Sequence, residues 1–212
     1  MGYKSFVSMN IAVIGAGNVS EKMAECLAMS GHEIYLGLKD EQTVSERLLR
    51  DNENIQACTI GNAACEADII IMAVPVDNLR EAAYLLGDVR KKIIIGVSGN
   101  VEPKPADFVH TVNAIKAITG AQHVVKCFTC GGYDELLSPS FKKNAADMFV
   151  AGDSKKAKEV VKLLAEIMGF ANCYDFGDND TVPLLEDMAK FWYNLAISQK
   201  LGQKISFKLI RG

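Results

Sequence analysis

The sequence is poor in histidine, has no long apolar run, and carries nearly balanced charges. Its three histidines stand at positions 32, 110 and 123, and no paired spacing among them suggests a zinc site. The longest apolar run covers residues 69–76, the length of a buried strand, whereas a membrane helix needs about 20 residues. A formal net charge of −3 gives no electrostatic reason to expect nucleic acid or a membrane as partner. We therefore predict neither a metal site nor a hydrolytic constellation.

Cysteine is present but scattered. Six cysteines stand in mostly apolar segments, at positions 26, 58, 65, 127, 130 and 173. A secreted disulfide scaffold would be shorter and denser in cysteine, so free thiols in a reducing cytoplasm are expected. Residues 1–9 show no secretory signal and are expected to be a short extension. The spacing of Cys127 and Cys130 fits a redox dithiol, half of a metal site, or neither.

Apolar strands alternate with amphipathic helices along the chain. This pattern predicts an α/β fold, a doubly wound and mostly parallel sheet covered on both faces. Strands are expected over 10–15, 32–38, 67–75, 91–99, 123–128, 147–152 and 172–177. Helices are expected after residue 17, within 39–54, over 77–87, 106–119 and 154–168, and from about 181. We divide the chain into a dinucleotide-binding domain (10–132) and a C-terminal lobe (133–212) that completes the sheet.

The most informative segment is "VIGAGNVSEKM" (13–23). In a dinucleotide site the first glycine makes the tight turn, the second lets the backbone approach the pyrophosphate, and the third lets the helix pack on the strand. Gly15 and Gly17 fit the first two positions, and Ser20 replaces the third glycine. Because the turn joins a buried strand to a helix, we predict that the helix N-terminus binds a nucleotide.

The residues at the end of the second strand determine whether a dinucleotide site prefers NADP or NAD. An acidic residue there would bind the ribose hydroxyls, whereas a basic residue would neutralise a 2′-phosphate. The chain reads Leu38-Lys39-Asp40. Lys39 favours NADP(H), and Asp40 leaves NAD(H) open as the alternative.

Several segments together resemble the NADP oxidoreductases that depend on coenzyme F420, a deazaflavin. They are "NIAVIGAGNVSEKMAECLAMSGHEIYLGLKD", "ADIIIMAVPVDN", "VVKCFTC", "DMFVAGDSKKAKEVVKLLAEIMGF" and "LLEDMAKFWYNLA". The same superfamily is similar to the reductase domain of six-transmembrane ferric reductases and to the N-terminal domain of pyrroline-5-carboxylate reductase. The resemblance implies a Rossmann domain, a small C-terminal lobe that covers the nicotinamide, and often a homodimer.

The resemblance also assigns site residues. It places Gly15, Gly17, Asn18 and Val19 at the pyrophosphate, Leu38 and Lys39 at the 2′-phosphate, Ala73, Val74 and Pro75 along the cofactor, and Cys127 to Thr129 beside the nicotinamide. This sequence departs from the family at Ser20, at Leu38-Lys39 where relatives have Ser-Arg, and at Thr129 where relatives have Asn or His. Lysine neutralises a phosphate as a point charge, whereas the arginine of the relatives can donate two parallel hydrogen bonds to it.

The expected function is hydride transfer between NADP(H) and a flavin- or deazaflavin-like acceptor. Such a reaction needs alignment of two rings rather than an acid or base, so no catalytic side chain is predicted, and Thr129 is expected only to contact the acceptor side. Two alternatives stay open: a catalytically silent dinucleotide-binding module, and an imine reductase of the pyrroline-5-carboxylate reductase type. Cys127 is then expected to be a small packing residue. Glu186, in the last helix, is expected either to bind backbone or cofactor groups or to be partly exposed.

Overall fold

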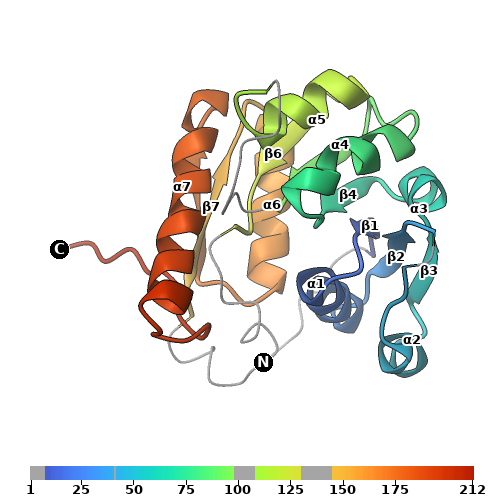
Figure 1. Cartoon of the computed structure of the whole chain (residues 1–212), viewed down its shortest axis with the longest axis horizontal. Helices are drawn as coiled ribbons and strands as arrows, with labels where there is room; N and C mark the ends of the chain where they lie inside the picture. The colour runs from blue at the N-terminus through green and yellow to red at the C-terminus, as the bar shows by residue number, and fades with distance from the viewer. Residues whose placement is uncertain (1–7, 41, 98–107, 130–144) are drawn as a thin grey trace.

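The computed structural model describes residues 8–40, 42–97, 108–129 and 145–212. These residues form one eight-stranded sheet with helices on both faces (Figure 1). The strands are β1 (Asn10–Ile14), β2 (Glu33–Leu38), β3 (Ile55–Thr59), β4 (Ile69–Met72), β5 (Ile93–Gly96), β6 (His123–Lys126), β7 (Asp147–Ala151) and β8 (Asn172–Gly177). The helices are α1 (Asn18–Met29), α2 (Glu46–Asp51), α3 (Ile60–Glu66), α4 (Val76–Leu85), α5 (Thr111–Thr119), α6 (Lys155–Ile167) and α7 (Val182–Tyr193), which continues into a π-helical turn over 194–198.

The strand order is β3-β2-β1-β4-β5-β6-β7-β8. Every neighbouring pair is parallel except β6 and β7, which are antiparallel. The order reverses between β1 and β4, which is the switch point where doubly wound sheets bind their ligands. The predicted fold class, an α/β and mostly parallel doubly wound sheet, is confirmed.

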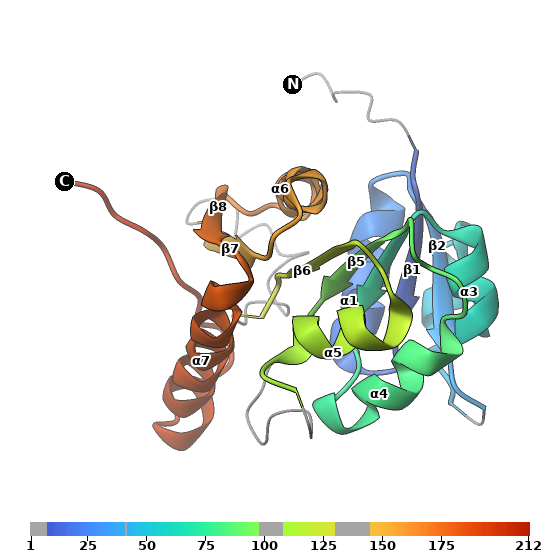
Figure 2. The same cartoon turned by 90° about the horizontal axis from the view of Figure 1, so that it is seen from above.

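Side-chain alternation along the strands divides the core into two layers. In β1, Ile11 and Val13 pack on the face covered by α1 and α6, whereas Ala12 and Ile14 pack on the face covered by α3, α4, α5 and α7. Figure 2 shows α4 and α5 side by side below the sheet and α6 on the other side of β6. The continuous apolar strands of the sequence follow from this burial on both faces.

Two elements were not predicted from the sequence, and three strands are markedly shorter than expected. β3 and α3 lie between residues 54 and 67, where no element was predicted. β3 is an edge strand in which Ile55 is buried but Gln56 and Ala57 are exposed, so it lacks the apolar run of a central strand. β4, β5 and β6 end at Met72, Gly96 and Lys126 instead of 75, 99 and 128.

The seam between β6 and β7 joins the two parts of the sheet. Its antiparallel pairing has a single register pair, Lys126 with Ala151. Gly152 follows at φ +141°, and a Cβ there would lie 2.9 Å from the Val125 side chain and 3.0 Å from the Val124 carbonyl oxygen. Glycine is therefore required for β7 to cross so close to β6. The domain boundary near residue 132 lies outside the described residues and stays a prediction.

Across the described residues, no helix combines the length and apolar character needed to cross a membrane.

Candidate functional site

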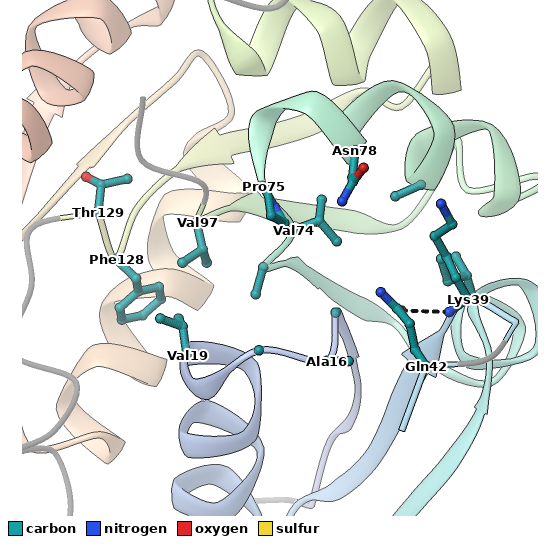
Figure 3. Close-up of a pocket in the computed structure, with 15 residues that line it drawn as sticks. Ala16, Val19, Lys39, Gln42, Val74, Pro75, Asn78, Val97, Phe128 and Thr129 are labelled. Carbon is teal, nitrogen blue, oxygen red and sulfur yellow. Dashed lines mark hydrogen bonds between the residues drawn. The ribbon is translucent and has the colours of Figure 1, made fainter. Parts of the chain in front are cut away.

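A cavity of about 490 Å³ opens at the carboxyl ends of the parallel strands, at the switch point (Figure 3). The residues that line it are Gly15, Ala16, Gly17, Val19, Lys39, Gln42, Ile60, Ala73, Val74, Pro75, Asn78, Ala82, Val97, Phe128 and Thr129. They come from the ends of β1, β2, β4, β5 and β6 and from the adjoining turns and helices. Parallel strands bring their carboxyl ends to one edge, so segments far apart in sequence meet here.

The turn after β1 contains two glycines with different structural requirements. Gly15 has φ +132°, and a Cβ there would lie 2.6 Å from the Ala73 carbonyl oxygen; its N–H donates to the Gly37 carbonyl oxygen at 3.0 Å. Gly17 has φ −96° and ψ 172°, which any residue adopts, and a Cβ there would meet no atom within 4 Å. The fold therefore requires glycine at position 15, but the described residues give no internal reason for glycine at position 17.

Ser20 occupies the place of the third glycine without obstructing the packing. It is fully buried in the first turn of α1, and its hydroxyl donates to the Gly17 carbonyl oxygen at 2.7 Å. The side chain thus folds back onto its own helix. The N-terminus of α1 reaches the cavity at Gly17 and Val19, where backbone N–H groups and the helix dipole favour a phosphate.

One end of the cavity is polar. Lys39 follows β2 and runs toward α4, where Asn78 also lines the wall (Figure 3). The Lys39 Nζ lies 2.6 Å from the Glu81 Oε2, and the Lys39 N–H donates to the Gln42 Oε1 at 2.9 Å. Asp40 is exposed and does not line the cavity. The positive charge at this end therefore comes from Lys39.

The opposite end is apolar and is closed by Val19, Val97 and Phe128, with Thr129 beside them (Figure 3). Phe128 is fully buried at φ +55°, and its ring packs 6.1 Å from that of Phe170. A positive φ is uncommon for a bulky residue, and it takes the chain out of the extended conformation directly after β6. This wall can exclude water from a flat ring bound beside it.

Cys127 takes a different position from the one that strand alternation predicts. Cys127 follows the end of β6 rather than lying within the strand, because the backbone turns at Phe128. Its side chain is fully buried in the core and does not line the cavity, and its N–H donates to the Gly96 carbonyl oxygen at 3.1 Å. Strand alternation would point Cys127 and Thr129 to one side and Phe128 to the other. This expectation was wrong, because Phe128 and Thr129 both line the cavity and Cys127 does not. Cys130 lies outside the described residues.

Close to this wall, a buried charged cluster joins β6, α5 and α7. Glu186 is 3% exposed, and its Oε1 accepts hydrogen bonds from the Thr111 N–H at 3.1 Å and the Thr111 hydroxyl at 2.6 Å. The fully buried Lys126 donates to the same hydroxyl at 3.1 Å and lies 3.7 Å from Glu186. Of the two expectations for Glu186, backbone binding is confirmed and partial exposure is wrong.

The three histidines serve structural hydrogen bonds. His32 Nδ1 accepts from the Met9 N–H at 3.3 Å, His110 Nδ1 accepts from the Asn113 N–H at 3.3 Å, and His123 Nδ1 pairs with the Ser154 hydroxyl at 2.9 Å. Burial lowers the pKa of His32 and of His110. In the part of the chain that the structure describes, no three His, Cys, Asp or Glu side chains gather closely enough to hold a metal ion.

Most of the predicted site residues meet in the cavity. Those that line it are Gly15, Gly17, Val19, Lys39, Ala73, Val74, Pro75 and Thr129, and those that do not are Asn18, Leu38 and Cys127. Sequence reasoning missed six lining residues: Ala16, Gln42, Ile60, Asn78, Ala82 and Val97. Phe128 lies within the range 127–129 that was expected beside the nicotinamide. Asn78 and Ala82 could have been found from their four-residue spacing on a helix that begins directly after a strand end. Since no described residue after Thr129 lines the cavity, cover by the C-terminal lobe stays a prediction.

Comparison with known proteins places this geometry in context. A family model described as NADP oxidoreductase coenzyme F420-dependent matches residues 10–100. An F420-dependent NADP reductase of Methanothermobacter thermautotrophicus is 24% identical, with 91% of each chain covered. A glycerol-3-phosphate dehydrogenase (NAD(P)+) of Chlorobium phaeobacteroides is 25% identical over 81% of this chain, but the match spans 63% of that longer protein.

Solved structures share the fold. A crystal structure of a putative F420-dependent NADP-reductase from Arthrobacter sp. FB24 superposes with a TM-score of 0.82 at 22% identity, covering 96% of this chain and 100% of the other. A reductive aminase from Aspergillus terreus, in complex with NADPH and ethyl levulinate, superposes with a TM-score of 0.68 at 13% identity, covering 92% of this chain and 64% of the other.

Proposed function

We propose that the chain, whose residues 10–100 match the model of the NADP oxidoreductase coenzyme F420-dependent family, binds NADP(H) in the cavity. We further propose that it transfers hydride between NADP(H) and a small redox acceptor with a flavin- or deazaflavin-like ring. The adenosine 2′-phosphate would lie at the Lys39 end of the cavity, and the nicotinamide at the wall of Val19, Val97 and Phe128.

The observation that carries the proposal is the open space at Gly17. Its backbone conformation suits any residue, and a Cβ there would meet no protein atom within 4 Å. Glycine at this position is explained by a ligand that must approach the backbone closely. Because Gly17 immediately precedes the first turn of α1, that ligand is best matched by the pyrophosphate of a dinucleotide.

The lining residues suit hydride transfer better than acid–base chemistry. Lys39 is the one ionisable side chain among the described lining residues, and it stands at the polar end. NADP(H) would supply the hydride, so the residues at the apolar end need only orient the ring and exclude water. Thr129 can offer a hydroxyl hydrogen bond to the ring's carboxamide or to the acceptor.

The choice of acceptor class is supported by the similarity to an F420-dependent NADP reductase along nearly its whole length. By contrast, this chain spans 64% of the reductive aminase, and at 13% identity that likeness concerns the fold alone. Flavin and deazaflavin acceptors therefore come first, and a cyclic imine serves as the competing substrate in the assay.

The test has two stages. Thermal unfolding is first measured with NADPH, with NADH and without nucleotide, and stabilisation by NADPH is expected. Oxidation of NADPH is then followed by its absorbance with FMN, FAD, a deazaflavin, a quinone and a cyclic imine. Turnover with a flavin or deazaflavin supports the proposal, and turnover with the imine alone would contradict it. Binding without turnover would instead indicate a silent nucleotide-binding module, and stabilisation by neither nucleotide would refute the proposal altogether.

Replacing Lys39 with alanine tests the orientation of the nucleotide. We expect Lys39→Ala to weaken NADPH binding at least about tenfold, since a hydrogen bond to a charged group contributes about 1.5–3 kcal/mol, and to leave NADH binding nearly unchanged. Lys162→Ala is the matched control, because Lys162 forms a similar surface ion pair with Glu159 away from the cavity. An equal loss for both nucleotides would contradict a 2′-phosphate at Lys39.

A further inference from the structure

Glu81 stands directly behind the proposed 2′-phosphate contact. It belongs to α4, the helix that lines the cavity through Asn78 and Ala82. Its Oε2 lies 2.6 Å from the Lys39 Nζ, and the two side chains are 57% and 31% exposed. The ammonium group that would meet a 2′-phosphate is therefore already engaged by a carboxylate.

The surrounding groups fix where Lys39 can act. Gln42 lines the cavity, and its Oε1 accepts a hydrogen bond from the Lys39 backbone N–H (Figure 3). The Gln42 Nε2 therefore lies on the other side of the carboxamide group. Asn78 stands on the α4 side of the same space. Both amides can donate to a ribose hydroxyl or to a phosphate. They do not discriminate by charge, which leaves discrimination to Lys39 and Glu81.

The two nucleotides respond differently to this ion pair. A phosphate monoester carries a charge of about −1.5 to −2 at neutral pH, whereas the NAD(H) ribose hydroxyls at the same place are neutral. Lysine has three donors and can contact Glu81 and a phosphate together, but the carboxylate then repels the phosphate. The repulsion is absent for NAD(H).

We propose that Glu81 is a specificity-determining residue that restrains the preference for NADP(H) over NAD(H). The inference rests on the proposed function, because it takes the 2′-phosphate to bind at Lys39. Glu81 partly cancels the charge of Lys39, so the wild-type protein binds the two nucleotides with more similar affinities than Lys39 alone would give.

The test is the variant Glu81→Gln, which keeps the size of the side chain and removes its charge. Dissociation constants for NADPH and NADH are measured by calorimetry on the full chain at low and high salt. We expect NADPH to bind about fivefold more tightly, the effect of one unit charge at surface separation in a high dielectric, and NADH to change less than about twofold. The gain for NADPH should shrink at high salt, because exposed charges are screened.

Glu159→Gln is the matched control, since Glu159 also forms an exposed ion pair with a lysine at 2.7 Å, on α6 away from the cavity. It should leave both affinities unchanged. An unchanged ratio of affinities in Glu81→Gln would overturn the proposal, and weaker NADPH binding would overturn it by showing that Glu81 instead holds Lys39 in place for the phosphate. Failure of the wild-type protein to bind either nucleotide would overturn the proposed function itself, a result that no Glu81 variant could produce.

Discussion

The two glycines after β1 allow a structural requirement to be separated from a functional one. Gly15 and Gly17 are two residues apart in the same turn, yet only Gly15 has a positive φ and a backbone oxygen in the place of a Cβ. Substituting alanine at each position adds one methyl group and changes no charge. Comparing Gly15→Ala with Gly17→Ala therefore distinguishes the effect of backbone strain from the effect of blocking the ligand.

Gly15→Ala should destabilise the fold. A φ of +132° is unfavourable for residues with a Cβ, at a cost of about 1–3 kcal/mol. The 2.6 Å approach to the Ala73 carbonyl oxygen adds to this, because a backbone atom cannot move aside as a flexible side chain can. We expect a loss of roughly 3 kcal/mol, which lowers the Tm of a domain of this size by about 6–12 °C.

Gly17→Ala should leave stability nearly unchanged. Its extended backbone suits alanine, and the reduced freedom of the unfolded chain stabilises the protein by about 0.4–1 kcal/mol. Position 17 is also the N-cap of α1, where alanine is less favourable than glycine by about 0.5–1 kcal/mol. The two effects on stability cancel, so the variant should fold as stably as the wild type. Its NADPH affinity should nevertheless fall at least about tenfold, because the added methyl group occupies the space that the ligand needs.

The assays are urea unfolding without nucleotide and calorimetric titration with NADPH, on the wild type and both variants. If Gly15→Ala unfolds at the same urea concentration as the wild type, backbone strain at position 15 is refuted. If Gly17→Ala binds NADPH as tightly as the wild type, no ligand explains the open space at position 17.

Two further predictions concern the buried polar groups. Glu186→Ala should lower the free energy of unfolding by about 3–5 kcal/mol, since it removes the acceptor for both Thr111 donors and the carboxylate 3.7 Å from Lys126. Glu186→Gln should lose less stability in the same urea titration. Equal stability of both variants and the wild type would contradict a buried charged cluster. Stability should also fall as the pH drops below about 6.5, because burial lowers the pKa of His32 and His110 from 6.5, so the unfolded chain binds more protons there. His110→Asn keeps an N-cap acceptor without a titrating ring and should make the pH dependence shallower, and a slope identical to that of the wild type would exclude His110 as a contributor.

The sequence was sufficient wherever burial on two faces leaves a clear pattern. β1 and β2 were predicted to within one residue of their observed bounds, because buried parallel strands read as apolar runs. β3 was missed because an edge strand with exposed residues leaves no such run. The glycine turn was also readable, since it rests on backbone conformation close to the strand.

The site was less predictable where tertiary geometry decides side-chain direction. Alternation gave the wrong orientation around Phe128 because the left-handed backbone there ends β6 at Lys126. The pairing of Lys39 with Glu81, 42 residues along the chain, had no local signal. Ser20 could be judged tolerable from its size, but its hydrogen bond to Gly17 required the structure.

The seam between β6 and β7 makes the C-terminal part a replaceable module. Every described residue that lines the cavity precedes residue 130, and β7, α6 and β8 form a βαβ unit whose two strands pair with each other. The unit meets the rest of the sheet through one register pair, the close crossing at Gly152 and the packing of α6 on β5 and β6. The contact of Phe170 with Phe128 and the contacts of α7, including Glu186, add to this. A different unit could be grafted at this seam if it supplied an equivalent glycine and carboxylate, an apolar helix face for β5 and β6, and a partner for Phe128. The same nucleotide cavity would then have a new neighbour, with no residue altered in its described walls.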